Sequence, residues 1–419
     1  MRECSKKRLA FVYLLIACLQ LTGPSVVNAS MNDISWQSTF KQQVLQHPSI
    51  VAVKEKMNAA ESIFRGSDKP VYNPEISTDV EREGDSNNYR IGITQTFDWQ
   101  DKVSIREKYT GLEFQAAKSV FHLAVQNQTA ETLRALVSWQ AASQQAVLAR
   151  EQEAQLDIML GWVDERQKSG DVGGIDAELT VLGLAQRLNT AASAEAALKN
   201  IKAIVDEVLP GSAINQQLIP EVFWSRVSGM SSHVNNTDEQ RWLEAHPAVM
   251  IAKSDWEKSK SMAQKVKQDI NPDPTVGINA GRTGDDNVFG LSLSLPLNIR
   301  NNYSAELNAA RQATLSAEAE YYAVRRQQQR LIASSLSVLQ VYQSRIHRLR
   351  QLMSGRGERR EKLINQQWRS GDLSTAEYLL VMQQVSESLS SGFELEKQFK
   401  LAHIDWLLQT GQLNAALIP

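Results

Sequence analysis

The chain has 419 residues, with 45 Lys plus Arg against 47 Asp plus Glu. Its 42% apolar content is ordinary for a globular protein, and the balanced charge offers no basic footprint for nucleic acid, so we do not expect nucleic-acid binding. This length is enough for two or three domains.

Residues 1–29 have the pattern of a signal peptide. Basic residues precede an apolar stretch from Leu9 to Leu21, which is too short to cross a bilayer as a helix. The small residues Val27-Asn28-Ala29 then fit a cleavage site. An alternative stays open, because Leu15-Ile16-Ala17-Cys18 also resembles a lipoprotein signal in which Cys18 is lipidated. In either case the mature chain keeps too few cysteines for an internal disulfide.

Three short motifs recur at a shift of about 200 residues, which indicates an internal repeat. The recurring pairs are His47-Pro48 with His246-Pro247, Asn73-Pro74 with Asp273-Pro274, and Ser169-Gly170-Asp171 with Ser370-Gly371-Asp372. We therefore expect two copies of one unit, residues 30–210 and 237–412. Residues 211–236 join them and 413–419 form a tail.

Each repeat contains two segments in which apolar and polar residues alternate, and this predicts β-strands. They lie within about 74–99 and about 274–297, with turns at Gly84-Asp85 and Gly284-Asp285. Strands of about 9–11 residues are long enough to cross hydrocarbon when tilted. Four strands cannot close a barrel, so we expect them to pair with strands of other copies.

The remaining sequence predicts helices. Residues 102–169 contain no proline and are rich in Glu, Gln, Ala and Leu, which predicts one helix of about 100 Å. Residues 302–370 are its counterpart, and shorter helices are expected at about 47–66 and 175–208. Each repeat thus carries a long helical hairpin, about 102–208 and about 302–410.

A signal peptide, a twofold repeat and strand hairpins that lead into very long helices together resemble the TolC family of outer-membrane efflux proteins. The junction from Leu295-Pro296-Leu297 to Arg300-Asn301 is similar to the strand-to-helix junction of its heavy-metal efflux branch. Residues 97–102 occupy the same place in the first repeat, but depart from the Gly-Gly-Lys-Arg form common in that branch.

The resemblance implies a mixed α+β fold in which a homotrimer closes a transmembrane β-barrel, four strands per protomer, continuous with a long periplasmic α-helical coiled-coil barrel. It implies residence in the outer membrane of a Gram-negative bacterium, with contacts to membrane lipid. The expected partners are a periplasmic adaptor (membrane fusion) protein and an inner-membrane pump of the resistance-nodulation-division class. The expected function is a passive duct for efflux of small substrates such as heavy-metal cations or drugs.

The alternative is a periplasmic coiled-coil structural or adaptor protein without a membrane barrel. An adaptor needs one helical hairpin beside compact β-domains, whereas this sequence predicts two hairpins of each kind. The paired hairpins therefore favour the duct.

The ends of the two helical hairpins hold the candidate site residues. Glycine permits the chain reversal, and the acid beside it fits either a capped surface turn or a contact with the adaptor. These residues are Gly170, Asp171, Gly371 and Asp372.

Three further residues are implied by the resemblance. Asp176 and Glu377 stand where the family places carboxylates around the periplasmic aperture, and Trp368 matches an aromatic position of the closed gate. Rings of such acids would attract cations. The chain departs from the family at Leu373, where a basic residue is common, and at Leu380, where a further acid is common.

No catalytic, cofactor or metal site is predicted. The six histidines lack metal-ligand spacing, and there is neither a glycine-rich phosphate loop nor a Gly-x-Ser-x-Gly motif. We therefore expect a protein that is not an enzyme and needs no cofactor.

Overall fold

The computed structural model describes residues 31–170, 173–210, 219–231, 236–298, 300–353, 363–364, 366–368 and 370–417. The predicted signal peptide, the candidate lipidation site Cys18 and Asp171 lie outside the described residues. The chain divides into two compact units. The sheet unit comprises residues 48–125 and 237–330, and the helical unit comprises 1–47, 126–236 and 331–419. Each unit contains parts of both sequence repeats.

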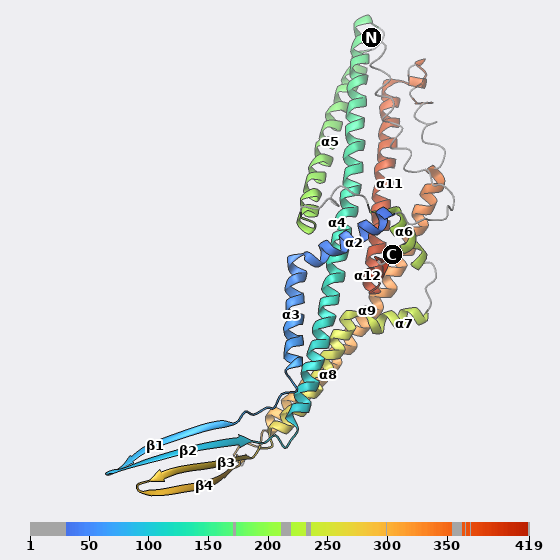
Figure 1. Ribbon diagram of the computed structural model, residues 1–419. Helices are drawn as coiled ribbons and strands as arrows, with labels where there is room; N and C mark the ends of the chain where they lie inside the picture. The colour runs from blue at the N-terminus through green and yellow to red at the C-terminus, as the bar shows by residue number, and fades with distance from the viewer. Residues whose placement is uncertain are drawn as a thin grey trace. The chain divides into compact units, whose positions relative to one another are not determined.

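The sheet unit contains one four-stranded antiparallel sheet in the order β1-β2-β3-β4 (Figure 1). The strands are β1 (Glu75–Glu83), β2 (Ser86–Thr96), β3 (Thr275–Thr283) and β4 (Asp286–Ser294). Each hairpin turns through a glycine in the left-handed region, Gly84 at φ 61° and Gly284 at φ 60°. Pairing of β2 with β3 joins the repeats, so β1 and β4 form the two edges.

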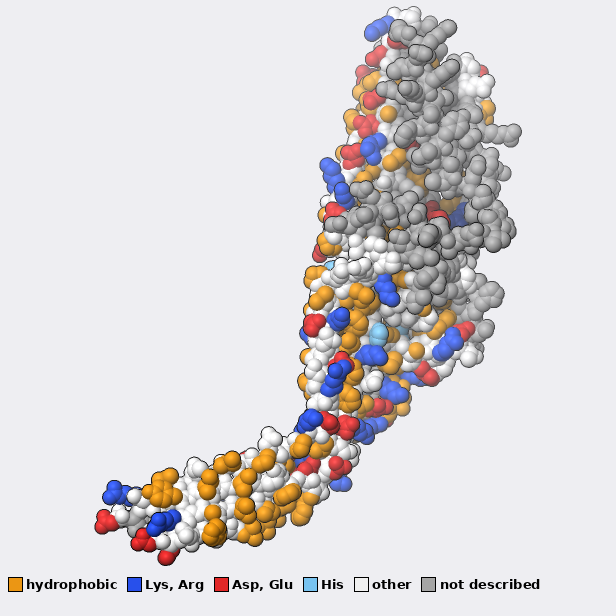
Figure 2. Space-filling view, in the orientation of Figure 1, with side chains coloured by type: hydrophobic (Ala, Val, Ile, Leu, Met, Phe, Trp, Pro, Cys, Tyr) orange, Lys and Arg blue, Asp and Glu red, His pale blue; other side chains and the backbone are white. Residues whose placement is uncertain are grey.

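One face of this sheet is apolar and exposed. Cross-strand partners such as Ile76 with Ile93, Ile93 with Ile278, and Ile278 with Leu291 share it. Phe289 is 84% exposed and Leu291 77%, although such side chains are normally buried in a soluble protein. Figure 2 shows the apolar side chains gathered over the strands, with charged side chains at the turn end.

The opposite face of the sheet is polar and rich in glycine. Its members include Gly92, Gly277, Gly281 and Gly290. A Cβ atom at Gly277 would lie 2.6 Å from the Ser292 hydroxyl oxygen, and one at Gly290 would lie 2.6 Å from Asn279 Oδ1. The small residues on this face therefore leave room for neighbouring polar side chains and for curvature toward this face.

Two helix pairs continue from the strands. In the first repeat α3 (Pro48–Arg65) packs on α4 (Lys102–Ser169), with the rings of Phe64 and Phe114 stacked at 6.1 Å. In the second repeat α7 (Asn236–Ala245) precedes α8 (Pro247–Asp269), which packs on α9 (Ser304–Met353) through Trp256 and Tyr321 at 5.5 Å. Both α3 and α8 begin at proline, which is favourable at a first helical position.

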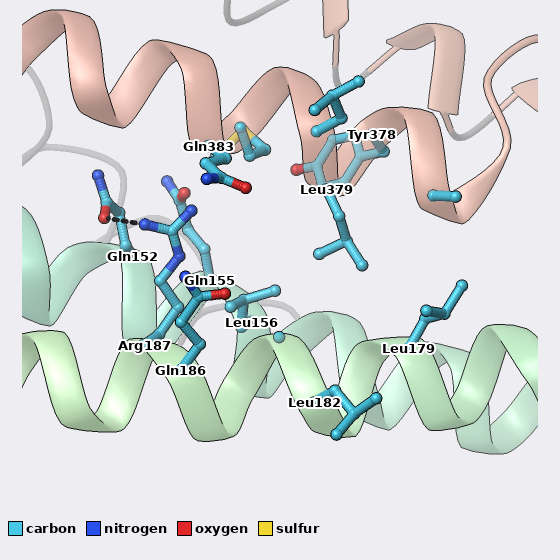
Figure 3. Close-up of a pocket in the computed structure, with 14 residues that line it drawn as sticks. Gln152, Gln155, Leu156, Leu179, Leu182, Gln186, Arg187, Tyr378, Leu379 and Gln383 are labelled. Atoms are coloured by element: carbon cyan, nitrogen blue, oxygen red, sulfur yellow. Dashed lines mark hydrogen bonds between the residues drawn. The ribbon is translucent and has the colours of Figure 1, made fainter.

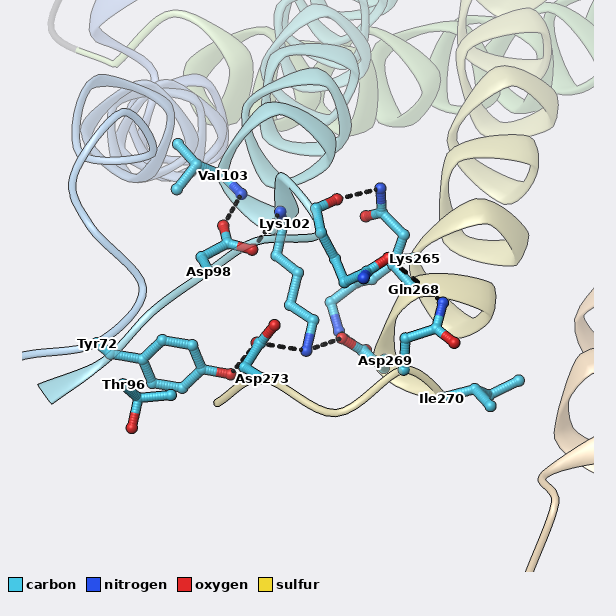
Figure 4. A network of polar contacts seen from close by, with 12 residues as sticks. Tyr72, Thr96, Asp98, Lys102, Val103, Lys265, Gln268, Asp269, Ile270 and Asp273 are labelled. Carbon is cyan, nitrogen blue, oxygen red and sulfur yellow. Dashed lines mark hydrogen bonds and ion pairs between the residues drawn. The ribbon is translucent and has the colours of Figure 1, made fainter. Parts of the chain in front are cut away.

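A polar network fixes the strand-to-helix junction of the sheet unit (Figure 4). Lys102 Nζ lies 2.8 Å from Asp273 Oδ2, and this oxygen also accepts a 2.8 Å hydrogen bond from the Tyr72 hydroxyl. Burial opposes the charge on Lys102, but Asp273 outweighs it and raises the pKa of Lys102. Asp98 accepts from the backbone N–H groups of Lys102 and Val103, so it caps the start of α4.

The helical unit is built on the remaining lengths of α4 and α9, together with α5 (Gly174–Val208) and α11 (Thr375–Gln409). In Figure 1 α5 runs back along α4. The described residues of this unit also form three shorter helices: α2 (Met31–Gln46), α6 (Glu221–Ser231) and α12 (Leu413–Ala416).

One part of the core of the helical unit is aromatic. Trp36 of α2 stacks on Phe40 at 5.0 Å and approaches Phe223 of α6 at 6.5 Å. Trp406 near the end of α11 is fully buried.

The mixed α+β fold class predicted from the sequence is confirmed. The four strands lie within the expected ranges, and α4 has the predicted bounds. In the second repeat α9 is described to Met353, and residues 354–362 lie outside the described part. Among the described helices, none is both long and apolar enough to span a membrane.

Candidate functional site at the helical hairpin ends

The first hairpin end has a glycine turn without a side-chain cap. The long helix α4 ends at Ser169, and Gly170 follows at φ 83°, with its N–H donating to Gln167 O at 3.1 Å. Helix α5 is preceded by Gly173, which supplies no side-chain cap. Asp176 is the third residue of α5, and its N–H donates to Gly173 O at 3.1 Å.

The second hairpin end repeats the glycine turn. Gly371 is again at φ 83°, and its N–H donates to Trp368 O at 3.2 Å. The N–H of Asp372 donates to Gln367 O at 2.9 Å, and the Asp372 carboxylate accepts a 2.7 Å hydrogen bond from the Ser370 hydroxyl. Asp372 therefore takes part in the hydrogen bonds of this turn.

Glu377 takes part in a capping box. Its backbone N–H donates to the Ser374 hydroxyl oxygen at 3.3 Å, while its carboxylate accepts from the Ser374 N–H at 3.0 Å and the Ser374 hydroxyl at 2.7 Å. These bonds, the backbone one first, lower the pKa of the exposed Glu377 carboxyl. The side chain thus holds the start of α11 and stays ionised at neutral pH.

Trp368 belongs to a stack of three aromatic rings. Its centroid lies 5.7 Å from that of Trp162 on α4 and 4.8 Å from that of Tyr378 on α11. Tyr378 is buried in a cluster with Leu156, Met159 and Val163 of α4. The stack therefore ties the second hairpin end to the long helix of the first repeat.

The same cluster brings the two hairpin ends together. Ala177, next to Asp176, packs against it, and Tyr378 follows Glu377 directly in the sequence. Within the described residues, no Lys or Arg lies in ion-pair distance of Asp176 or Glu377. The described part of the chain also contains no group of three His, Cys, Asp or Glu side chains that could hold a metal ion. In the described part of this end, Asp176 and Glu377 thus carry acidic charge that no ion pair neutralises.

Neither a protein-family model nor a curated protein matches this sequence. The fold is instead similar to solved membrane channels. The outer-membrane channel CmeC of Campylobacter jejuni matches with a TM-score of 0.73 and 13% identity, covering 94% of this chain and 90% of CmeC. The chain has the fold of outer-membrane channels.

Two further structures support this conclusion. The outer-membrane protein VceC of Vibrio cholerae gives a TM-score of 0.71 at 12% identity, covering 90% of this chain and 96% of its own. The open state of the MtrE outer-membrane channel of Neisseria gonorrhoeae gives 0.68 at 13% identity, covering 93% of both chains. The shared fold spans nearly the whole length of each protein.

Sequence reasoning missed the partners of the predicted site residues. The capping box could have been predicted from the sequence, because Ser374 stands three residues before Glu377 at the start of a helix. Trp162 and Tyr378 carried no such signal, because their contacts join segments that are far apart in the chain.

Proposed function

We propose that this chain is a subunit of an outer-membrane efflux channel of the TolC family. The observation that carries the proposal is the exposed apolar face of the β1–β4 sheet, which is backed by a polar, glycine-rich face and bounded by two unpaired edge strands. An apolar face toward lipid and a polar face toward a lumen are the arrangement of a membrane barrel. The channel fold described above supports the same function.

Closure of the barrel requires more than one copy. Membrane barrels have at least about eight strands, and open strand edges are not tolerated in lipid. We propose a homotrimer in which β1 of one copy pairs with β4 of the next. Helices of the hairpins would then form the periplasmic part of the duct and contact an adaptor and an inner-membrane pump.

The aperture residues remain part of this proposal. We propose that Asp176 and Glu377 lie near the periplasmic opening. Trp368 would pack at this opening when the channel is closed. Contacts with the adaptor are assigned to the glycine turns, at Gly170 and Asp171 in the first repeat and at Gly371 and Asp372 in the second.

The proposed cargo is a small toxic compound, with heavy-metal cations as the first class and drugs as the second. A passive duct needs no pocket for its cargo, because the partner pump selects it. Deletion of the gene should make cells more sensitive to heavy-metal cations, to drugs or to both. Unchanged tolerance to both, with the pump expressed and active, would argue against efflux.

A cysteine pair tests the trimer directly. The sequence after residue 30 contains no cysteine. Cysteines introduced as Ser77→Cys on β1 and Ser292→Cys on β4 therefore meet no native cysteine in this part of the chain that could form a competing disulfide. In one protomer these edges are separated by three strand spacings of about 4.8 Å, too far for a disulfide. Oxidation in the outer membrane should therefore give a covalent trimer.

Each single substitution is the control and should give at most dimers. A scan of Val288, Ser292 and Ser294 against Ser77 covers the possible registers. Recovery of only monomers across this scan, in the soluble periplasmic fraction, would support the alternative of a helical periplasmic protein without a barrel.

A further inference from the structure

The helical unit contains a cavity of about 320 Å³ between α4, α5 and α11 (Figure 3). This volume lies at the lower end of the range for small-molecule sites, about 300–1,000 Å³. Its walls combine aliphatic side chains with four glutamine amides and one guanidinium. The polar members are Gln152, Gln155, Gln186, Arg187 and Gln383.

Among the described residues that line the cavity, Arg187 is the only lysine or arginine. It comes from α5, and Figure 3 shows its side chain lying between the glutamines of α4 and α11. Its Nη1 lies 3.1 Å from Gln152 Oε1 and 3.4 Å from the Ser386 hydroxyl oxygen. Both partners are neutral, and no carboxylate of the described residues lies in ion-pair distance of Arg187.

The surroundings of Arg187 disfavour the positive charge of its guanidinium. Burial lowers the pKa of the Arg187 guanidinium, and the charge of Glu387 opposes this only in part. Nε and Nη2 make no hydrogen bond to the described residues, although a guanidinium offers five N–H donors. The N–H groups of Nε and Nη2 can together donate to the two oxygens of one carboxylate, which forms a bidentate pair.

The apolar wall determines the rest of the ligand. Leu156, Leu179 and Leu182 lie on one side, and Leu379 of α11 lies on the other. Met382 of α11 also lines the cavity. Such a surface accepts a hydrocarbon or aromatic body. Gly183 also lines the cavity, and a Cβ there would lie 3.6 Å from Leu379 Cδ2, an ordinary contact.

We propose that this cavity binds a small amphipathic organic anion, with its carboxylate on Arg187 and its apolar body between α5 and α11. A bound anion would replace the missing countercharge of Arg187. It would also bridge the helical hairpins of the two repeats. The inference concerns a site inside one protomer and does not depend on the proposed function.

Binding of 4-phenylbutanoate to the purified full-length protein tests this site. The protein is kept in buffer with a non-ionic detergent, which suits a membrane protein and a soluble protein alike, and calorimetric titration is corrected with the same buffer without protein. The acid should bind saturably. The neutral alcohol 4-phenylbutan-1-ol should bind at least about tenfold more weakly, because a charge-assisted bond is lost.

Two variants separate the charge from the cavity. Arg187→Gln should weaken binding of the acid by about tenfold or more and leave binding of the alcohol unchanged. Gly183→Leu keeps Arg187 and fills the cavity, so it should abolish binding of both compounds. It also favours the helix, which protects folding.

Arg150→Gln is the matched control, because this arginine pairs with Glu195 outside the cavity. It should bind the acid as the unmodified protein does. Equal affinity for acid and alcohol, full affinity in Arg187→Gln or Gly183→Leu, or no saturable binding up to about 10 mM probe would each overturn the proposal.

Discussion

At the scale of single residues, His403 makes the helical unit sensitive to acid. Its side chain is fully buried in α11, with its ring 4.5 Å from that of Phe399. Burial lowers the pKa of His403 to about 4, and the backbone of Phe399 opposes this shift. The folded state therefore takes up its proton at lower pH than the unfolded state does.

The sign of the pH dependence follows from this lowered pKa. The contribution of neutral His403 is fully present above the unfolded pKa of 6.5 and is lost as pH falls toward about 4. We expect a loss of up to about 3 kcal/mol in the free energy of unfolding of the helical unit. Hydrogen exchange near 399–410, corrected for intrinsic rates, measures it.

His403→Leu should remove most of this slope, because it removes the titrating group at similar volume. His347→Gln, at an exposed position of α9, is the control and should keep the slope. An unchanged slope in His403→Leu would refute the assignment to His403.

The cap of α11 gives a second prediction at the residue scale. Ser374→Ala removes the hydroxyl that accepts from Glu377 N–H and should destabilise the start of α11 by about 1 kcal/mol. Faster hydrogen exchange in residues 375–380 measures this change. Ser374→Asp keeps a capping acceptor and is the control. Equal exchange in Ser374→Ala and the unmodified protein would show that the packing of Tyr378 alone holds this end.

At the scale of the elements, the pairing of β2 with β3 depends on Gly281. A Cβ at this position would approach the carbonyl oxygen of Tyr89 more closely than van der Waals contact allows, and it would lie 2.9 Å from the Cα atom of Arg90. Both obstacles are backbone atoms, which cannot rotate away. Gly281→Ala should therefore lower the stability of the sheet by about 1–3 kcal/mol.

The amount of protein in the outer membrane and the heat stability of its oligomer measure the effect of Gly281→Ala. Ala280→Val is the matched control, because the neighbouring residue points to the exposed apolar face. If both variants assemble equally well, the close backbone approach at Gly281 is not important for the sheet.

The strands and long helices could be predicted from sequence because their signals are local. Alternation over β4 and the proline-free run of α4 each determine one element without reference to the rest of the chain. The Lys102–Asp273 pair and the Trp162–Trp368 stack could not be predicted in this way. They depend on which helices become neighbours, and periodicity does not contain that information.

At the scale of the whole molecule, the acids of the hairpin ends should control ion selectivity. Asp176→Asn with Glu377→Gln removes charge, while glutamine can keep the capping box with Ser374. In planar-bilayer recordings this double variant should show reduced cation selectivity. The reduction should be clearest at low salt, where the screening length exceeds its value of about 10 Å at 0.1 M.

Asp85→Asn with Asp286→Asn at the strand turns is the control for selectivity. Both positions are exposed, at the end of the sheet away from the helices. If these substitutions changed selectivity more than those at Asp176 and Glu377, our placement of the aperture at the helical hairpin ends would be wrong.

The aromatic stack at the hairpin ends has a consequence for symmetry. Three copies of a twofold repeat would give a tube with approximate sixfold symmetry, which becomes threefold wherever the repeats differ. Tyr378 and Ala177 occupy equivalent positions, seven residues after Gly371 and Gly170, yet one carries a large ring and the other a methyl group. Only alternate hairpins would therefore carry the ring. In the proposed trimer the six hairpin ends would thus be of two alternating kinds, and the ring that these ends form would have threefold rather than sixfold symmetry.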